Sequence, residues 1–289
     1  MANSDSHRLG QLIGLMLERA IKPQLQSILG PSHFLDSVST SRSARNGKKK
    51  VTWLDAQGNK HDLDFVIEQN GTDLVFGNPK AFIECAWRRY TKHSKNKAQE
   101  IQGAVIPLAE TYANHKPFLG AILAGEFTAP SLQQLQSVGF NVLYISYNDI
   151  VQAYALGANL DISYVEKTSL IDLKNKADAV ENLNIQQVDN VIQFLIGIIQ
   201  PKLNVFLQSL QISLMRSIKK VVVQPLFGTT NIFQDALSAQ QYLSAIDLNI
   251  VPNNLTCNWI FIFVEYSNGE NFRAEFLDKI SALDFLSKF

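Results

Sequence analysis

Apolar residues in the first part of the chain follow a helical period and then a strand period. Over residues 8–29 they recur every three or four positions, as on one face of an amphipathic helix. Residues 51–54 and 61–69, joined by a polar turn at 57–59, predict a β-hairpin, and residues 80–87 predict a third strand. We therefore expect a helix followed by a three-strand meander.

The next part of the chain alternates between helices and strongly apolar strands. A helix is expected over residues 96–112, and two apolar strands are expected at 118–124 and 140–147, each followed by a further helix. Strands without polar alternation are typical of parallel sheets that helices cover on both faces. Residues 1–165 are therefore predicted to form one α/β domain.

The remaining residues, 166–289, have a different pattern and are expected to form a C-terminal domain. Residues 170–218 are predicted to be helical, with a break at Pro201. Residues 233–244 (FQDALSAQQYLS) and 276–287 (FLDKISALDFLS) then share six identical residues in register, and apolar strands with a glycine turn precede each segment. This pattern predicts a degenerate strand–strand–helix repeat.

Composition narrows the class of protein further. The 26 Lys and Arg residues balance 26 Asp and Glu residues, which excludes a histone-like protein, and the 46% hydrophobic content excludes a largely disordered chain. Two cysteines, Cys85 and Cys257, exclude a disulfide scaffold and fit a reducing cytoplasm. The uninterrupted apolar runs, such as Trp259–Val264, are too short to span a bilayer. With no export signal at the start, we expect a cytoplasmic protein that is not bound to a membrane.

Two carboxylates are the first candidates for chemistry. Asp64 lies in the predicted hairpin, and Glu84 ends an apolar run in the third strand. Neighbouring antiparallel strands can bring the two carboxylates together at one end of a sheet. Such a pair, completed by a backbone carbonyl and waters, is a hard oxygen site suited to Mg²⁺.

The surroundings of Glu84 are strongly basic although the whole chain is neutral. Between Lys80 and Lys97 there are six Lys or Arg residues and one acid, with Trp87 and Tyr90 interleaved. Cations and aromatic rings beside a metal site suit a phosphate backbone. The separate basic run at residues 42–50 is interpreted as a loop that is a weaker candidate for DNA contact.

These segments resemble the PD-(D/E)XK nuclease superfamily, which includes most restriction endonucleases, several repair nucleases and junction resolvases. The resemblance is carried by the element order and by the segments 64–67 (DFVI) and 82–87 (FIECAW), and it covers residues 8–150. The family pattern has a lysine two residues after the glutamate, where this chain has Ala86. The resemblance implies an α/β, restriction-endonuclease-like core made of a helix, a three-strand meander, a helix, a strand, a helix and a strand.

The resemblance also implies roles for individual residues. Asp64 and Glu84 would hold Mg²⁺, with Glu100 and Glu18 as further carboxylates. Lys97, or secondly Lys95, would replace the missing lysine. Contacts with phosphates are expected from four further side chains: Arg88, Arg89, Lys92 and His93.

The predicted function is therefore a Mg²⁺-dependent endonuclease that cleaves double-stranded DNA, most simply a restriction enzyme. The C-terminal domain would supply sequence recognition or dimerisation, and a homodimer is expected because both strands of a palindrome must be cut. One alternative is a repair or junction-resolving nuclease. Another is a DNA-binding protein that has lost catalysis, which the alanine at position 86 would explain. Each acid taken alone is also compatible with an ordinary surface position.

Overall fold

The chain forms two compact units. The computed structural model describes residues 4–225, 228–247 and 259–289. The first unit contains residues 1–111 and 117–211, and the second contains residues 112–116 and 212–289. The predicted boundary at residues 165/166 is therefore wrong, because the helices that follow it pack on the first unit.

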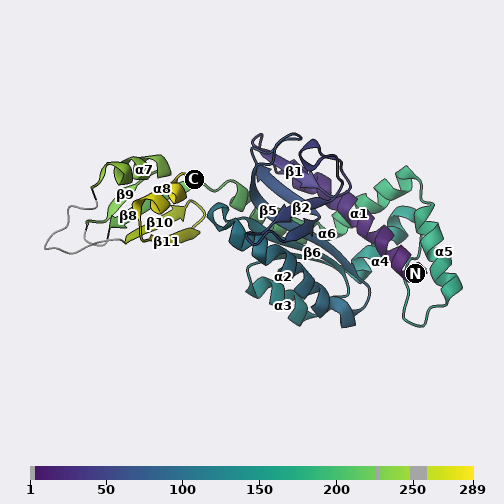
Figure 1. Ribbon diagram of the computed structural model, residues 1–289. Coiled ribbons are helices and arrows are strands. Elements are labelled where there is room, and N and C mark those ends of the chain that lie inside the picture. The colour runs from purple at the N-terminus through teal and green to yellow at the C-terminus, as the bar shows by residue number, and fades with distance from the viewer. Residues whose placement is uncertain (1–3, 226–227, 248–258) are drawn as a thin grey trace. The chain divides into compact units, whose positions relative to one another are not determined.

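The first unit is a mixed α/β structure, shown with its labels in Figure 1. Its α-helices are α1 (Asp5–Ser27), α2 (Ser94–Thr111), α3 (Ala129–Ser137), α4 (Tyr147–Ala158), α5 (Leu170–Glu181) and α6 (Ile185–Leu214). Its strands are β1 (His33–Ser37), β2 (Val51–Leu54), β3 (Lys60–Leu63), β4 (Phe65–Gln69), β5 (Asn78–Arg88), β6 (Phe118–Gly125) and β7 (Asn141–Ser146).

Five of these strands form one sheet in the order β1-β4-β5-β6-β7. The pairs β1–β4 and β4–β5 are antiparallel, whereas β5, β6 and β7 are parallel, as the apolar strands predicted. The first strand of the meander is β1, which the sequence analysis missed because HFLDS is short and partly polar. The predicted strand 51–54 instead pairs with β3 in a separate two-stranded ribbon.

Helices α5 and α6 belong to the first unit through specific contacts. Arg8 of α1 is 2.7 Å from Asp178 of α5 in an ion pair, and Figure 1 shows the two helices side by side. The ring of Phe206 in α6 packs edge-on against Phe118 of β6, with 5.5 Å between the ring centroids. A Cβ on Gly157 in α4 would lie 2.5 Å from the backbone of Val191, so α4 and α6 cross at very close range.

Helix α6 runs through Pro201 without a break, contrary to the prediction. The proline removes the donor for the carbonyl of Gly197, one turn earlier, and because both residues are exposed, water can satisfy that carbonyl. Among the described residues, α6 alone is long and apolar enough to pass a membrane-span test based on length and composition. The search for uninterrupted apolar runs did not detect it because glutamines interrupt its apolar residues.

The second unit consists of two strand–strand–helix halves, as the repeat predicted. The first half is β8 (Ile218–Pro225), β9 (Asn231–Phe233) and α7 (Ala236–Ala245). The second half is β10 (Ile260–Tyr266), β11 (Asn271–Phe276) and α8 (Lys279–Leu286). The four strands form one sheet in the order β11-β10-β8-β9, with β8 and β10 antiparallel at its centre.

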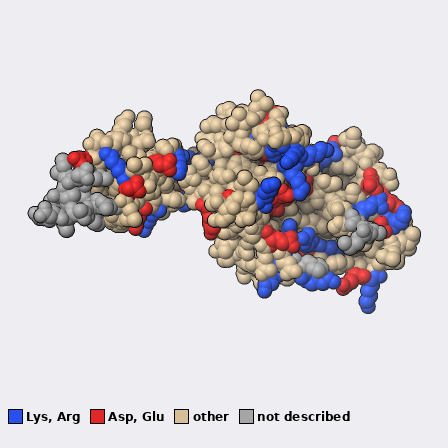
Figure 2. Space-filling view, viewed as in Figure 1, with Lys and Arg blue, Asp and Glu red and all other residues tan. Residues whose placement is uncertain are grey.

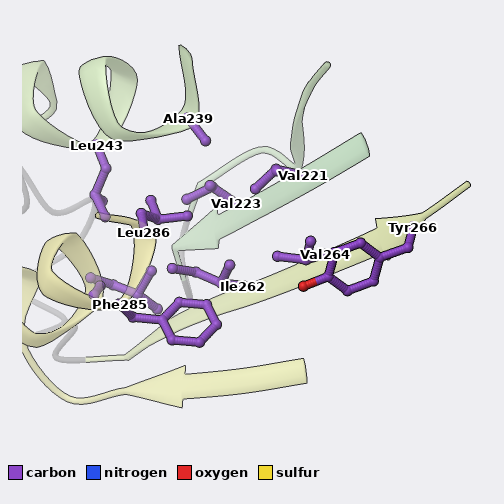
Figure 3. Close-up of a cluster of buried hydrophobic side chains, with 11 residues drawn as sticks. Val221, Val223, Ala239, Leu243, Ile262, Val264, Tyr266, Phe285 and Leu286 are labelled. Atoms are coloured by element: carbon purple, nitrogen blue, oxygen red, sulfur yellow. The ribbon is translucent and has the colours of Figure 1, made fainter. Parts of the chain in front are cut away.

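The two halves begin their helices in the same way. Asp235 accepts a hydrogen bond from the backbone N–H of Ser238, and Asp278 accepts one from Ser281, each at 2.7 Å. Figure 3 shows side chains of both helices, including Leu243 of α7 and Leu286 of α8, packed on the valines and isoleucine of the central strands. The identical aspartates of the repeat are therefore helix caps, and its identical alanine and leucine pairs are core positions.

The basic run after β1 contains buried ion pairs. Arg42 is 2% exposed and donates to Asp36 at 2.7 Å and to both carboxylate oxygens of Glu68, at 2.5 and 3.0 Å. Arg45, also buried, donates to the same aspartate at 2.9 Å. Neither arginine is placed to contact DNA, which corrects that part of the interpretation of residues 42–50. These residues are a loop with a 3₁₀ turn at Ser43–Arg45, as expected, and the lysines at 48–50 are exposed.

Candidate functional site

Asp64 occupies the point where the chain leaves the β2–β3 ribbon and enters the five-stranded sheet as β4. Its Oδ2 accepts a hydrogen bond of 2.7 Å from the backbone N–H of Cys85 in β5. Burial raises the pKa of Asp64, while this hydrogen bond and the positive charge of Lys97 act in the opposite direction. The carboxylate is therefore fixed against β5, close to the next acid.

Glu84 lies in the buried middle of β5, one residue beyond the Phe65–Ile83 pair of the β4–β5 register. Its side chain is 8% exposed, and its Oε1 accepts no hydrogen bond from the residues that the structure describes. Burial, and then the charge of Asp64, raise the pKa of Glu84 to about 8. A buried carboxylate with an unpaired oxygen beside another acid is costly to keep ionised unless a cation joins it.

Glu18 approaches the same place from α1. It is half-buried, and burial together with the charge of Asp64 raises its pKa to about 7. The acids that the sequence analysis named thus come from three separate elements: α1, the β3–β4 junction and β5. Burial is the main cause of the raised pKa of all three acids, and the charge of Asp64 raises the pKa of Glu18 and of Glu84 further.

Lys97 supplies a positive charge to these acids. It lies in the first turn of α2, its side chain is 20% exposed, and its charge lowers the pKa of both Asp64 and Glu84. Two residues after Glu84 the chain has Ala86, and that alanine is buried. A cation from the following helix is therefore close enough to both carboxylates to influence their ionisation.

The second-choice lysine and the fourth acid are placed less favourably. Lys95 is exposed, and two residues correspond to about 200° around a helix, so it does not share the face of Lys97. Glu100 is also exposed, and it lies 3.2 Å from Lys97 and 3.5 Å from Arg88. Glu100 is thus engaged with cations rather than with the acidic group.

Of the other cations expected to bind phosphate, Arg89 has the clearest structural role. Its guanidinium donates to the carbonyl of Tyr164 and stacks 3.8 Å from the centroid of the Tyr147 ring. Lys92 is exposed and pairs with Glu166 at 2.8 Å. The side chain of His93 lies outside the described part of the structure. Figure 2 shows basic side chains beside acidic ones on the visible face of this unit, rather than one continuous basic surface.

A cleft opens beside Lys97, between α1 and the end of β5. Its volume is about 530 Å³, and it is lined by Ser6, His7, Gly10, Gln11, Gly14, Cys85, Ala86, Trp87, Arg88, Arg89, Tyr90, Lys92, Lys97 and Tyr164. A Cβ on Gly10 would lie 3.3 Å from the indole of Trp87, whereas one on Gly14 would meet nothing within 4 Å. Because glycine has no side chain, Gly10 and Gly14 leave space along the α1 wall of the cleft.

Sequence reasoning missed this wall of the cleft, although a signal for it was present. Gly10, Gly14 and Glu18 are spaced by four residues, so they lie on one face of α1. Glycine inside a helix costs about 1 kcal/mol relative to alanine, so two glycines in line with an acid indicate a helix face that is kept free of side chains.

The residues present fit a hard divalent cation. Glu84 has an unpaired buried oxygen, Asp64 and Glu18 add carboxylates, and oxygen ligands of this kind suit Mg²⁺. Among the described residues, no group of three or more His, Cys, Asp and Glu side chains is arranged to hold a metal by itself. A metal here would be bound by two carboxylates completed by backbone oxygens and waters, the usual manner for Mg²⁺.

Comparison with known proteins adds no family to this description. No family model matches the chain, and neither a curated protein nor a solved structure matches it.

Proposed function

We propose that this chain is a Mg²⁺-dependent endonuclease that hydrolyses phosphodiester bonds of double-stranded DNA, on a PD-(D/E)XK-like core. The observation that carries the proposal is that Glu84 lies buried in β5 with an unpaired oxygen, next to Cys85, whose backbone N–H holds the Asp64 carboxylate at 2.7 Å. Glu18 and Lys97 are near enough to Asp64 to act on it electrostatically. The order of helix, three antiparallel strands, helix and parallel strand supports the assignment of the core. A restriction endonuclease working in the cytoplasm is the simplest form of this proposal.

The residues of the chain would have different roles in such a reaction. Asp64 and Glu84 would hold the metal, with Glu18, whose pKa the charge of Asp64 raises, as a further carboxylate. When bound, the metal polarises the phosphodiester and lowers the pKa of water. Lys97 favours the ionised form of Asp64 and Glu84 against the effect of burial, and it is placed to donate to an anionic phosphate oxygen. Arg88, partly exposed at the cleft, is the arginine best placed to contact a flanking phosphate.

The buried alanine at position 86 favours one competing function. A chain that had lost the family lysine without replacement would bind DNA and not cut it. The two possibilities differ in the role of Lys97: the nuclease needs its charge for the reaction, whereas the binding protein needs it only for affinity.

The test is cleavage of long unmethylated plasmid and phage DNA with and without Mg²⁺, for the native chain and for Glu84→Gln. The matched control is Glu110→Gln, which changes an exposed acid at the other end of α2. We expect discrete bands that require Mg²⁺, unchanged cutting by the control and no cutting by Glu84→Gln.

The other outcomes separate the alternatives. A smear of products would support a repair or junction-resolving nuclease, to be followed on branched DNA. Salt-sensitive binding without cutting would support the DNA-binding protein. If the chain neither cuts nor binds DNA, the proposal is refuted.

A further inference from the structure

Four helices of the first unit surround a small apolar pocket that the proposed reaction does not use. Its volume is about 210 Å³, and aliphatic side chains of α1, α5 and α6 make up most of its lining, among them Leu12, Met16, Val180 and Val191. The two α1 residues are each two positions from Gly14, which corresponds to about 200° around a helix. The pocket therefore lies on the other side of α1 from the cleft that Gly14 lines.

One polar side chain reaches this pocket from the core, that of Tyr154 in α4. The residue is 1% exposed, and the hydrogen bonds that the structure describes for it are accepted by its backbone carbonyl, from Asn159 and Leu160. Burial raises the pKa of Tyr154, and among the described residues neither a hydrogen bond nor a charge adds to that effect or opposes it.

The hydroxyl of Tyr154 is consequently available inside the pocket. It is not one of the fully enclosed polar atoms without a partner, so it opens on the space that the residue lines. A buried tyrosine hydroxyl usually finds a hydrogen-bond partner, and it can both donate and accept. The pocket thus combines apolar walls with one unused hydrogen-bonding group.

The charged groups at the pocket are already paired within the chain. Arg19, which lines the pocket, lies 2.6 Å from Asp189 of α6. Glu181, which also lines it, pairs with Arg8 of α1. The lining therefore favours a neutral molecule, because an ionised one would have to compete with an existing ion pair.

We propose that this pocket binds a small, neutral ring compound that carries one hydrogen-bonding group, which pairs with the Tyr154 hydroxyl. A cavity of about 150 Å³ holds benzene, so a pocket of about 210 Å³ has room for a fused bicyclic ring. Water alone is a poor occupant, because a buried water needs several polar partners and these walls are mainly apolar. The inference does not depend on the proposed nuclease activity, because the pocket and the cleft lie on different sides of α1.

The experiment is an NMR chemical-shift titration of the full chain with indole and with indene. The two probes have nearly the same shape, but only indole has an N–H group that can donate to the hydroxyl oxygen of Tyr154. Tyr154→Phe removes that oxygen and keeps the ring, whereas Val188→Phe enlarges a lining side chain so that it fills the pocket. The matched control is Val205→Phe, which makes the same change on α6 at a position that is 66% exposed and outside the pocket.

We expect the native chain and the control to bind indole with a Kd of roughly 0.1–1 mM, and indene about fivefold more weakly. Tyr154→Phe should bind indole as weakly as indene, and Val188→Phe should bind neither. Circular dichroism and thermal melting should show that all the variants fold, since the hydroxyl that is removed has no partner to lose. The proposal is overturned if the native chain binds neither probe, if Tyr154→Phe binds indole as tightly as the native chain does, or if Val188→Phe still binds.

Discussion

The buried cluster around Arg42 offers a measurable test of why a basic segment follows β1. We consider Arg42→Met, which keeps an apolar chain of similar length and removes the guanidinium. In the native protein this group also donates to the carbonyls of Thr72 and Val75, at 2.7 and 2.8 Å, in the turn between β4 and β5. The substitution therefore breaks a buried ion pair and the support of that turn together.

The expected cost follows from the burial of the partners. Glu68 is 0% exposed, so without Arg42 its charge is left with the backbone N–H of Gly77, at 2.6 Å, and no paired cation. Removing one member of a buried ion pair costs about 3–5 kcal/mol. At about 2–4 °C for each kcal/mol in a unit of this size, the melting transition of the first unit should fall by roughly 6–20 °C.

The assay is urea and thermal unfolding, with DNA binding measured in parallel. The control Lys48→Met changes an exposed lysine of the same segment and should alter stability by no more than about 0.5 kcal/mol. The double variant Arg42→Met/Glu68→Gln should be more stable than Arg42→Met alone, because no unpaired carboxylate remains. Native-like stability of Arg42→Met, combined with weaker DNA binding, would refute the structural role and restore the arginine as a DNA contact.

Three further predictions concern single residues. Lys97→Met should lower the rate of DNA cleavage by about 10²–10³-fold in single-turnover assays, whereas Lys95→Met, two residues away, should change it little; equal effects would contradict the assignment. Hydrogen bonds, first of all with the imidazole of His61, lower the pKa of Asp55. The contribution of Asp55 to stability is therefore present above about pH 4 and is lost as the pH falls further. Asp55→Asn should therefore destabilise the protein most at pH 7 and progressively less as the pH falls below about 4 in urea titrations, and a loss that grows toward low pH would count against it. Asp235→Ala and Asp278→Ala should each cost about 1 kcal/mol in the second unit, and very different losses would show that the two caps are not equivalent.

Much of the fold was predictable because local patterns and tertiary packing agree. The parallel strands β6 and β7 are continuous apolar runs, and the repeat in the second unit was visible from its caps and core residues. The predicted hairpin of residues 51–54 and 61–69 was only partly right. Its second arm is divided, because β3 ends at Leu63 and the chain continues as β4 in another sheet. Residues 61–69 have one alternating pattern, yet the chain changes sheets at Asp64, and no local signal marks that change.

The acids of the site were predictable, but their surroundings were not. The sequence pointed to Asp64, Glu84 and Lys97 through their order and residue type. It gave no indication that Arg89 would be held by the carbonyl of Tyr164, because that contact joins residues far apart in the chain. A run of basic residues therefore separates into structural and exposed members only once the fold is known.

The duplication in the second unit has a consequence for its history. The two central strands, β8 and β10, pair antiparallel, so both halves contribute the same strand edge to the contact between them. A single half would expose that edge and one side of its core, and two separate copies would complete the same four-stranded sheet. Joining the halves in one chain makes that association independent of concentration. The second unit is thus equivalent to a small homodimer that has been tied into a single polypeptide.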